Sequence, residues 1–220
     1  MRKTILYIAM SLDGYIADKN GSVDWLTGQD TDEENVDTYS EFVKDIDTVV
    51  MGWKTYAQVI TELSPGKWPY ENLTSYIITH RNEKPAEKIR FVREDPCELI
   101  MRLRKMQGKN IWICGGAGII QPLIKGNLID EYYISIIPAI LGDGIPLFGK
   151  RETEIQLQLK YTRTYNGITE LVYVGGNRTF MIKAIFFDLD GTLLSHTTRC
   201  IPQDTVQVLR KLRDKSLWIN

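Results

Sequence analysis

The stretch that decides the fold reads IWICGGAGIIQPLI over residues 111–124. Its first four residues form an apolar run typical of a strand buried on both faces, and residues 119–124 continue as an apolar helical run. Gly115, Gly116 and Gly118 lie between the two, where adjacent glycines let a ligand approach the backbone closely. The free N–H groups at the start of the following helix suit a diphosphate. A plain tight turn between strand and helix would use the same glycines, so this stretch alone leaves both interpretations open.

A second junction of this kind lies upstream. The apolar run 48–51 leads into Gly52, and a helix can begin at Lys54. Lys54 offers a positive charge and Thr55 a hydroxyl donor beside a helix N-terminus, where anions bind readily. Two anion sites in one sheet suggest a dinucleotide ligand. Taken singly, Lys54 could be a solvated surface lysine and Thr55 a simple helix cap.

Outward from these junctions, apolar strand-like runs alternate with amphipathic helices. Strands are predicted at 5–10, 48–51, 76–79, 89–92 and 111–114, and helices at 31–46, 54–60, 96–107 and 119–124. The first helix is predicted from a capping box at 31–34. Repeated strand–helix units predict a mainly parallel sheet covered on both sides. After an extended run at 132–140, alternating residues on either side of Asn166-Gly167 predict a closing antiparallel hairpin.

Composition excludes several classes of protein. Apolar residues make up 43% of the 220 residues, and 27 Lys and Arg nearly cancel 28 Asp and Glu, which disfavours general nucleic-acid binding. No apolar run approaches the length of about 20 residues that a membrane span needs, and no signal-peptide cleavage pattern follows the N-terminus, so we expect a cytoplasmic protein. Three scattered cysteines and two histidines predict neither a disulfide framework nor a metal site.

Five motifs follow one another along the first three quarters of the chain. They read YIAMSLDGYIA over 7–17, VDWL over 23–26, VMGWKTY over 50–56, GG over 115–116 and PAILGDGIPLF over 138–148. In order and spacing they resemble the dihydrofolate reductase superfamily, and most closely its RibD C-terminal-domain branch. The resemblance covers about residues 1–175. It implies a three-layer α/β reductase domain at 1–177, with a mainly parallel central sheet and a C-terminal antiparallel hairpin.

The resemblance also implies NADPH as the cofactor. Gly52, Lys54 and Thr55 would bind one phosphate region, and Gly115, Gly116, Ala117 and Gly118 would surround the diphosphate. Ala9 and Ile16 would flank the nicotinamide, where an apolar wall holds the ring and excludes water. Plain core packing is the alternative for both residues.

The chain departs from the family pattern at the cofactor end. Many members carry Arg after the strand-end glycine, where this chain has Trp53. One cation for the 2′-phosphate is therefore missing, and NADH stands as an alternative cofactor unless Lys54 compensates.

A second departure concerns the substrate end. Folate reductases place a carboxylate on the first helix; alignment on Phe42 puts Thr38 there, and Asp37 should point elsewhere because one residue turns a helix by about 100°. Dihydrofolate reduction is therefore not expected, and no general acid is assigned. Thr38 and Trp25 are predicted to bind substrate, although Trp25 could instead be a core plug. Asp13 is expected to stabilise the turn at Gly14, and His80 to be a solvated loop residue.

The remaining residues, 178–220, carry a different signal. FDLDGTLL over 187–194 resembles the first motif of the haloacid dehalogenase superfamily, in which Asp188 would attack a phosphoryl group and Asp190 would act as acid and base around Mg²⁺. A helix with Val206, Leu209 and Leu212 on one face should follow. The chain stops where the second strand should start, so we expect an incomplete strand–helix appendage without phosphatase activity.

Together these features predict an NADPH-dependent reductase of a small heterocyclic or carbonyl substrate. The alternative is a non-catalytic nucleotide-binding or assembly module that keeps the fold. We also expect a homodimer, because Tyr132, Tyr133, Ile134, Ile136 and Ile137 place more apolar surface on one strand than a single sheet face can bury.

Overall fold

The computed structural model describes residues 1–29, 36–150, 154–175, 184–185, 207 and 218–219. The chain divides into two compact units, Met1–Asn177 and Arg178–Asn220.

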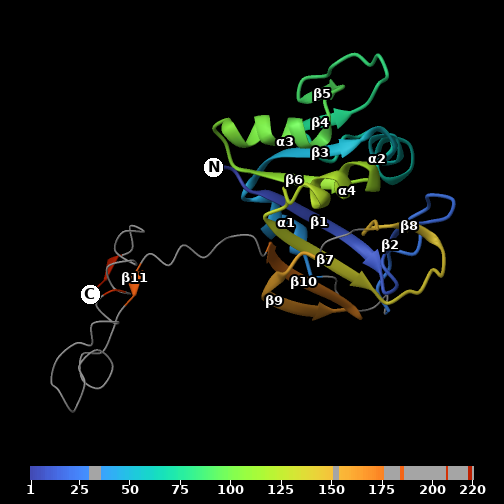
Figure 1. The fold of residues 1–220 in the computed structure, drawn as a ribbon. Coiled ribbons are helices and arrows are strands. Elements are labelled where there is room, and N and C mark those ends of the chain that lie inside the picture. Colours follow the sequence, from blue (N-terminus) through green and yellow to red (C-terminus); the bar gives the residue numbers. More distant parts are fainter. Residues whose placement is uncertain (30–35, 151–153, 176–183, 186–206, 208–217, 220) are drawn as a thin grey trace, which may run out of the picture. The chain divides into compact units, whose positions relative to one another are not determined.

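An eight-stranded sheet forms the centre of the first unit (Figure 1). Its strands, in spatial order, are β5 (Ile89–Val92), β4 (Thr74–Ile78), β3 (Ile46–Gly52), β6 (Asn110–Gly115), β1 (Thr4–Ser11), β7 (Glu131–Ile137), β10 (Ile168–Gly175) and β9 (Leu157–Tyr165). The first six pair in parallel, whereas β10 is antiparallel to both β7 and β9. The predicted parallel sheet and closing hairpin are confirmed. A separate antiparallel pair, β2 (Tyr15–Asp18) with β8 (Gly144–Pro146), was not predicted.

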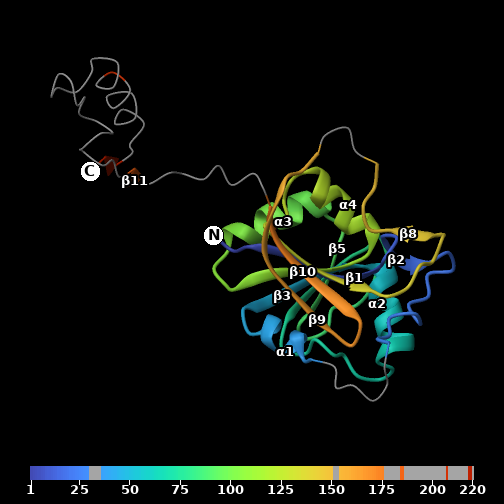
Figure 2. The same ribbon diagram turned by 90° about the horizontal axis from the view of Figure 1, so that it is seen from below.

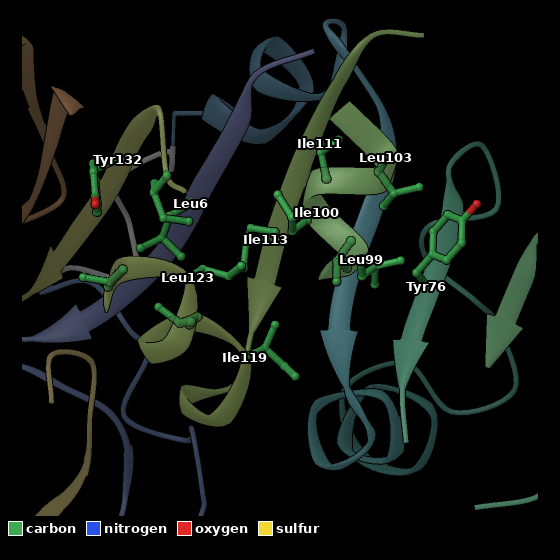
Figure 3. Packing of buried hydrophobic residues seen from close by; sticks show 14 of the residues in the cluster. Leu6, Tyr76, Leu99, Ile100, Leu103, Ile111, Ile113, Ile119, Leu123 and Tyr132 are labelled. Carbon is green, nitrogen blue, oxygen red and sulfur yellow. The ribbon is translucent and has the colours of Figure 1, made fainter. Parts of the chain in front are cut away.

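Helices cover both faces of this sheet, as Figure 2 shows. On one face, α3 (Pro96–Lys105) and α4 (Ala117–Lys125) pack Leu99, Leu103 and Leu123 against strand residues such as Leu6 and Ile113 (Figure 3). On the other face lie α1 (Thr38–Val43) and α2 (Trp53–Gln58), the latter continuing as one π-helical segment, η1 (Val59–Leu63). We call the ring side chains on this second face the aromatic cluster: Tyr7, Tyr39, Phe42, Tyr70, Trp112 and Tyr133.

Local sequence chemistry explains where the elements begin and turn. The Asp95 side chain caps α3 by accepting from the amides of Cys97 and Glu98, and Pro96 occupies its first turn. Asn166 and Gly167 have φ values of 46° and 71°, the left-handed pair that a two-residue hairpin turn requires. Because the inner parallel strands are covered on both faces, their apolar runs are nearly continuous rather than alternating.

The first helix differs from its prediction. The described helix begins only at Thr38, where Asp37 accepts from the Ser40 amide at 2.9 Å, and the capping box at 31–34 lies outside the described residues. Val36 is exposed, and Ile46 is the first, buried residue of β3 rather than the last helical turn. The 3.6-residue spacing of these apolar positions thus crosses from helix into strand, which periodicity alone does not separate.

Strand β7 also differs from the expectation built on it. Its side chains alternate between the two covered faces, so Tyr132, Ile134 and Ile137 are all buried within this unit. Tyr133 and Ile136 are half-buried, so this unit covers most of the apolar surface on which the expected homodimer rested, and the homodimer itself stays a prediction.

In the second unit, β11 (Ala184–Ile185) pairs in parallel with β12 (Trp218–Ile219). Asp188, Asp190 and the predicted helix around Leu209 lie outside the described residues. In the described parts of the chain, no helix has the length and apolar character needed to cross a membrane.

Candidate cofactor and substrate site

The two predicted strand–helix junctions meet in the structure. Strand β3 is hydrogen-bonded to β6, so Gly52 and Gly115 end neighbouring strands at the same edge of the sheet. A Cβ atom added at Gly116 would lie 3.3 Å from the Thr55 hydroxyl oxygen, and one at Gly115 would lie 3.4 Å from it. Thr55 therefore faces the glycine turn directly. The sequence pattern predicted two anion sites in one sheet, but not that these two sites adjoin.

The glycine turn leaves room and donors for a ligand. Gly115 has a φ of 150°, which favours glycine, and the Gly115–Gly116 peptide is cis. Ile119 and Ile120 both donate to the Gly116 carbonyl, whereas the amides of Ala117 and Gly118 donate to no acceptor among the described residues. A Cβ at Gly118 would meet no atom within 4 Å. These amides can bind a diphosphate oxygen without displacing any protein group.

A cation that was not predicted lies beside the Gly52 junction. The Arg81 guanidinium lies 4.7 Å from the centre of the Trp53 ring, and its backbone amide donates to the Thr79 hydroxyl at 3.1 Å. Lys54, in the first turn of α2, is exposed on the same edge. The sequence did contain a signal for Arg81. It follows β4 by three residues, and because the ends of parallel strands share one edge of the sheet, a cation there is expected near the Gly52 junction.

Ala9 and Ile16 occupy different faces. Ala9 is half-buried on the face of the aromatic cluster, where it is the register partner of Ser135. Ile16, in β2, packs against the opposite cluster beneath α3 and α4. The two residues thus lie on either side of the end of β1, a placement open to both the cofactor-flanking and the core-packing interpretation.

Asp13 joins two loops rather than only stabilising its own turn. Its carboxylate accepts from the Ser11 hydroxyl at 2.6 Å and from the amides of Leu141 at 3.1 Å and Gly142 at 2.7 Å. The Ser11 hydrogen bond is the main reason that the pKa of Asp13 lies below its usual value. The Leu12 amide also donates to the Ala139 carbonyl, so residues 11–14 and 138–142 are tied together at this edge.

The predicted substrate residues are engaged with the protein itself. Thr38 is buried, and its hydroxyl lies 2.8 Å from the Tyr7 hydroxyl in a hydrogen bond. Asp37 points elsewhere, as predicted, because it caps α1. Trp25 is half-buried and donates its indole N–H to the Ser22 carbonyl at 3.3 Å. His80 is exposed after β4.

Cys114 was not singled out from the sequence, yet it precedes the glycine turn on the aromatic face. Its thiol lies 4.0 Å from the Tyr70 hydroxyl, and burial raises the pKa of the thiol to about 12. Cys114 is therefore a neutral thiol at pH 7, not a nucleophile. Within the described residues, no three His, Cys, Asp or Glu side chains gather closely enough to hold a metal ion.

Comparison with known proteins places this geometry in a family. The model of the RibD C-terminal domain matches residues 2–172. The chain belongs to the RibD C-terminal domain family.

Relatives of similar length support the assignment. The uncharacterized protein YwjB of Bacillus subtilis strain 168 is 41% identical over 174 residues, which cover 79% of this chain and 98% of YwjB. A crystal structure of a Shewanella sp. PV-4 protein provisionally assigned to riboflavin biosynthesis has a TM-score of 0.68 and 32% identity, and the match covers 79% of this chain and 98% of that one.

Dihydrofolate reductase of Enterococcus faecalis, solved with NADP(H), shares the fold. Its TM-score is 0.54 at 17% identity, and the match covers 80% of this chain and 97% of that one. The RibD C-terminal domain seen here thus has the α/β dihydrofolate-reductase-like fold. Residues 178–220 lie beyond the family match, and no finding supports their haloacid dehalogenase resemblance.

Proposed function

We propose that this RibD C-terminal domain is an NADPH-dependent reductase that delivers hydride to a small heterocyclic or carbonyl substrate. The position of the Thr55 hydroxyl, 3.3–3.4 Å from where a Cβ atom at Gly116 or Gly115 would lie, is the observation that carries the proposal. It joins two phosphate-binding junctions into one continuous edge, and a dinucleotide is the ligand whose phosphates would span them.

The residues present fit the diphosphate and the adenosine end of the cofactor. The amides of Ala117 and Gly118 would hold diphosphate oxygens, with the Thr55 hydroxyl as a further donor. Arg81, held over Trp53, and the exposed Lys54 would bind the 2′-phosphate. Arg81 therefore takes the place of the cation that Trp53 removes, which favours NADPH over NADH.

The nicotinamide end would lie at the end of β1. NADPH supplies the hydride when bound. The chain's own part is to position the ring and exclude water, for which Ala9 offers a flat apolar floor and Asp13 ties down the two loops beside it. The Thr38 hydroxyl, paired with Tyr7, offers no carboxylate, so dihydrofolate is not the substrate that we propose.

A pyrimidine is among the heterocyclic candidates because of the RibD family resemblance, and two similar proteins are named for riboflavin biosynthesis. The RibD protein of Haemophilus influenzae is matched over only 47% of its length, so its whole activity is not carried over.

The test follows the nicotinamide absorbance of NADPH in the presence of the protein and candidate pterins, pyrimidines or carbonyl compounds. We expect protein-dependent loss of absorbance with at least one candidate. Tight NADPH binding without turnover of any candidate would instead favour the non-catalytic nucleotide-binding module.

A further inference from the structure

Glu170, on β10, is a buried carboxylate that the proposed cofactor site does not use. Its residue is 0% exposed, and Oε1 accepts from Arg163 Nε at 2.6 Å across the hairpin. The other oxygen, Oε2, has no hydrogen-bond partner among the described residues. A buried carboxylate oxygen without a donor is destabilising, so this position calls for a donor that the described part of the chain does not supply.

The charge around Glu170 is only partly balanced. Arg163 also donates from Nη1 to Oε2 of Glu41 on α1, at 3.1 Å. Two carboxylates thus share one guanidinium, which leaves this corner with a net negative charge. An N–H donor that carries positive charge would be favoured here, and a phosphate would be repelled.

Glu170 adjoins the candidate nicotinamide position. The strand register pairs Glu170 with Ser135 on β7, and Ser135 with Ala9 on β1, so the three form one row on one face of the sheet. Glu170 and Ser135 are opposite residues of an antiparallel pair, and such residues have Cβ atoms about 4.5–5.5 Å apart. Ser135 and Ala9 are half-buried, so solvent reaches the row immediately beside the fully buried carboxylate.

Helix α1 covers the same face. Phe42 stacks on the Tyr7 ring with centroids 4.3 Å apart, Thr38 binds the Tyr7 hydroxyl, and Glu41 reaches Arg163. A flat molecule resting on Ala9 and Ser135 would therefore lie between two features of this face. The Tyr7 and Phe42 rings would be on its β1 side, and the Glu170 carboxylate would be on its β10 side.

We propose that Glu170 is the substrate-binding carboxylate of this domain and that its Oε2 accepts an N–H from a cationic or amidine-like nitrogen heterocycle lying on Ala9 and Ser135. The proposal rests on the reductase function above and names its substrate class. The carboxylate that binds the substrate would then lie on the C-terminal hairpin. It would not lie on α1, where the corresponding residue, Thr38, has no carboxylate. Carbonyl compounds without an N–H donor would gain nothing from this group.

The experiment compares two probes of equal size by calorimetry, each with and without NADPH. 2,4-Diaminopyrimidine presents adjacent N–H donors, and 2,4-dimethylpyrimidine presents none. For the parent chain we expect the diamino probe to bind about tenfold or more tightly than the dimethyl probe, the usual effect of a hydrogen bond to a charged group. In Glu170→Gln this ratio should fall to near one.

Two further variants serve as controls. Glu41→Gln removes the exposed partner of Arg163 and one negative charge from this corner but leaves the Glu170–Arg163 pair, so the ratio should fall much less than in Glu170→Gln. Ser135→Val fills the space beside Glu170 without touching its ion pair and should weaken both probes. A ratio near one in the parent, or a parent-like ratio in Glu170→Gln, would overturn the proposal. Because the ratio is also measured without NADPH, a failure of cofactor binding would contradict the reductase function separately.

Discussion

Arg81 sets the expected cofactor preference at the scale of single residues. Its guanidinium is held over the Trp53 ring beside the exposed Lys54, where a 2′-phosphate would bring two negative oxygens. NADH lacks that phosphate, so a cation at this position acts on NADPH alone.

Arg81→Gln should therefore weaken NADPH binding about tenfold or more and change NADH binding little. Affinities for both cofactors, measured by calorimetry at one salt concentration, check this. Arg90→Gln removes an exposed charge from the neighbouring β5 and serves as the control. Equal losses for NADPH and NADH in Arg81→Gln would show that the residue is not the phosphate partner.

The sequence pointed to some residues of the candidate site and not to others. Lys54, Thr55 and the glycines were candidates because each lies just after an apolar strand-like run. Arg81 and Glu170 were not, since one acts through its stacking on Trp53 and the other through its register with Ser135. The Arg81–Trp53 contact and the Glu170–Ser135 pairing both join residues distant in sequence, so no local sequence pattern predicts them.

At the scale of elements, the Asn166-Gly167 turn holds the hairpin that carries Glu170. Gly167 has a φ of 71°, and a Cβ there would lie 2.5 Å from the Gln29 side chain. Gly21 has a similar φ of 88° but open space around its Cβ position.

Gly21→Ala should cost about 1 kcal/mol of unfolding free energy, from the left-handed backbone alone. Gly167→Ala should cost more, because Gln29 must also move. Urea denaturation of both variants checks the difference. Equal stability of the two variants would mean that Gln29 does not support the turn.

Strand β7 starts with a buried charge that makes stability depend on pH. Glu131 is buried, which raises its pKa, but Lys3 at 2.6 Å and Lys160 at 3.3 Å outweigh burial, and the net pKa is lowered. A carboxyl whose folded pKa lies below its unfolded value of about 4.5 stabilises the fold above that pH and loses the contribution as pH falls through the folded pKa.

Glu131→Gln should accordingly be less stable than the parent by about 1–2 kcal/mol at pH 7, and the gap should narrow below about pH 4.5. Denaturation curves across this pH range measure it. Glu71→Gln, at an exposed carboxylate, should show no such gap. A gap that persists unchanged at pH 3 would contradict the ion-pair explanation.

The strand and helix alternation could be predicted because each buried run is long and bounded by glycine, proline or acidic caps. The short α1 could not, since its apolar period continues smoothly into Ile46 of β3. The β2–β8 pair was missed for a related reason: it consists of short segments whose pairing depends on loops distant in sequence.

At the scale of the whole molecule, the expected homodimer needs a different surface. β7 is an inner strand whose residues are buried or half-buried, whereas β9 is an edge strand on which Leu159 is 53% exposed and Tyr161 36% exposed. Edge strands with exposed apolar side chains are common sites of association. We propose β9 as the dimer contact.

Leu159→Lys should convert a dimer to a monomer in light scattering at micromolar concentration, because a charge replaces the apolar contact. Gln158→Lys adds the same charge to the neighbouring exposed position and should leave the dimer intact. A parent chain that scatters as a monomer would contradict the homodimer itself.

The central claim is that a dinucleotide diphosphate binds where Thr55 faces the glycine turn, and Gly118 allows the most direct measurement. A Cβ at Gly118 meets no protein atom within 4 Å, so the side chain that Gly118→Val adds starts in open space, where the proposed diphosphate would lie. Calorimetric titration with NADPH should show binding by the parent and a loss of about tenfold or more in this variant, at an unchanged melting temperature. NADPH binding by Gly118→Val as tight as that of the parent would contradict the account.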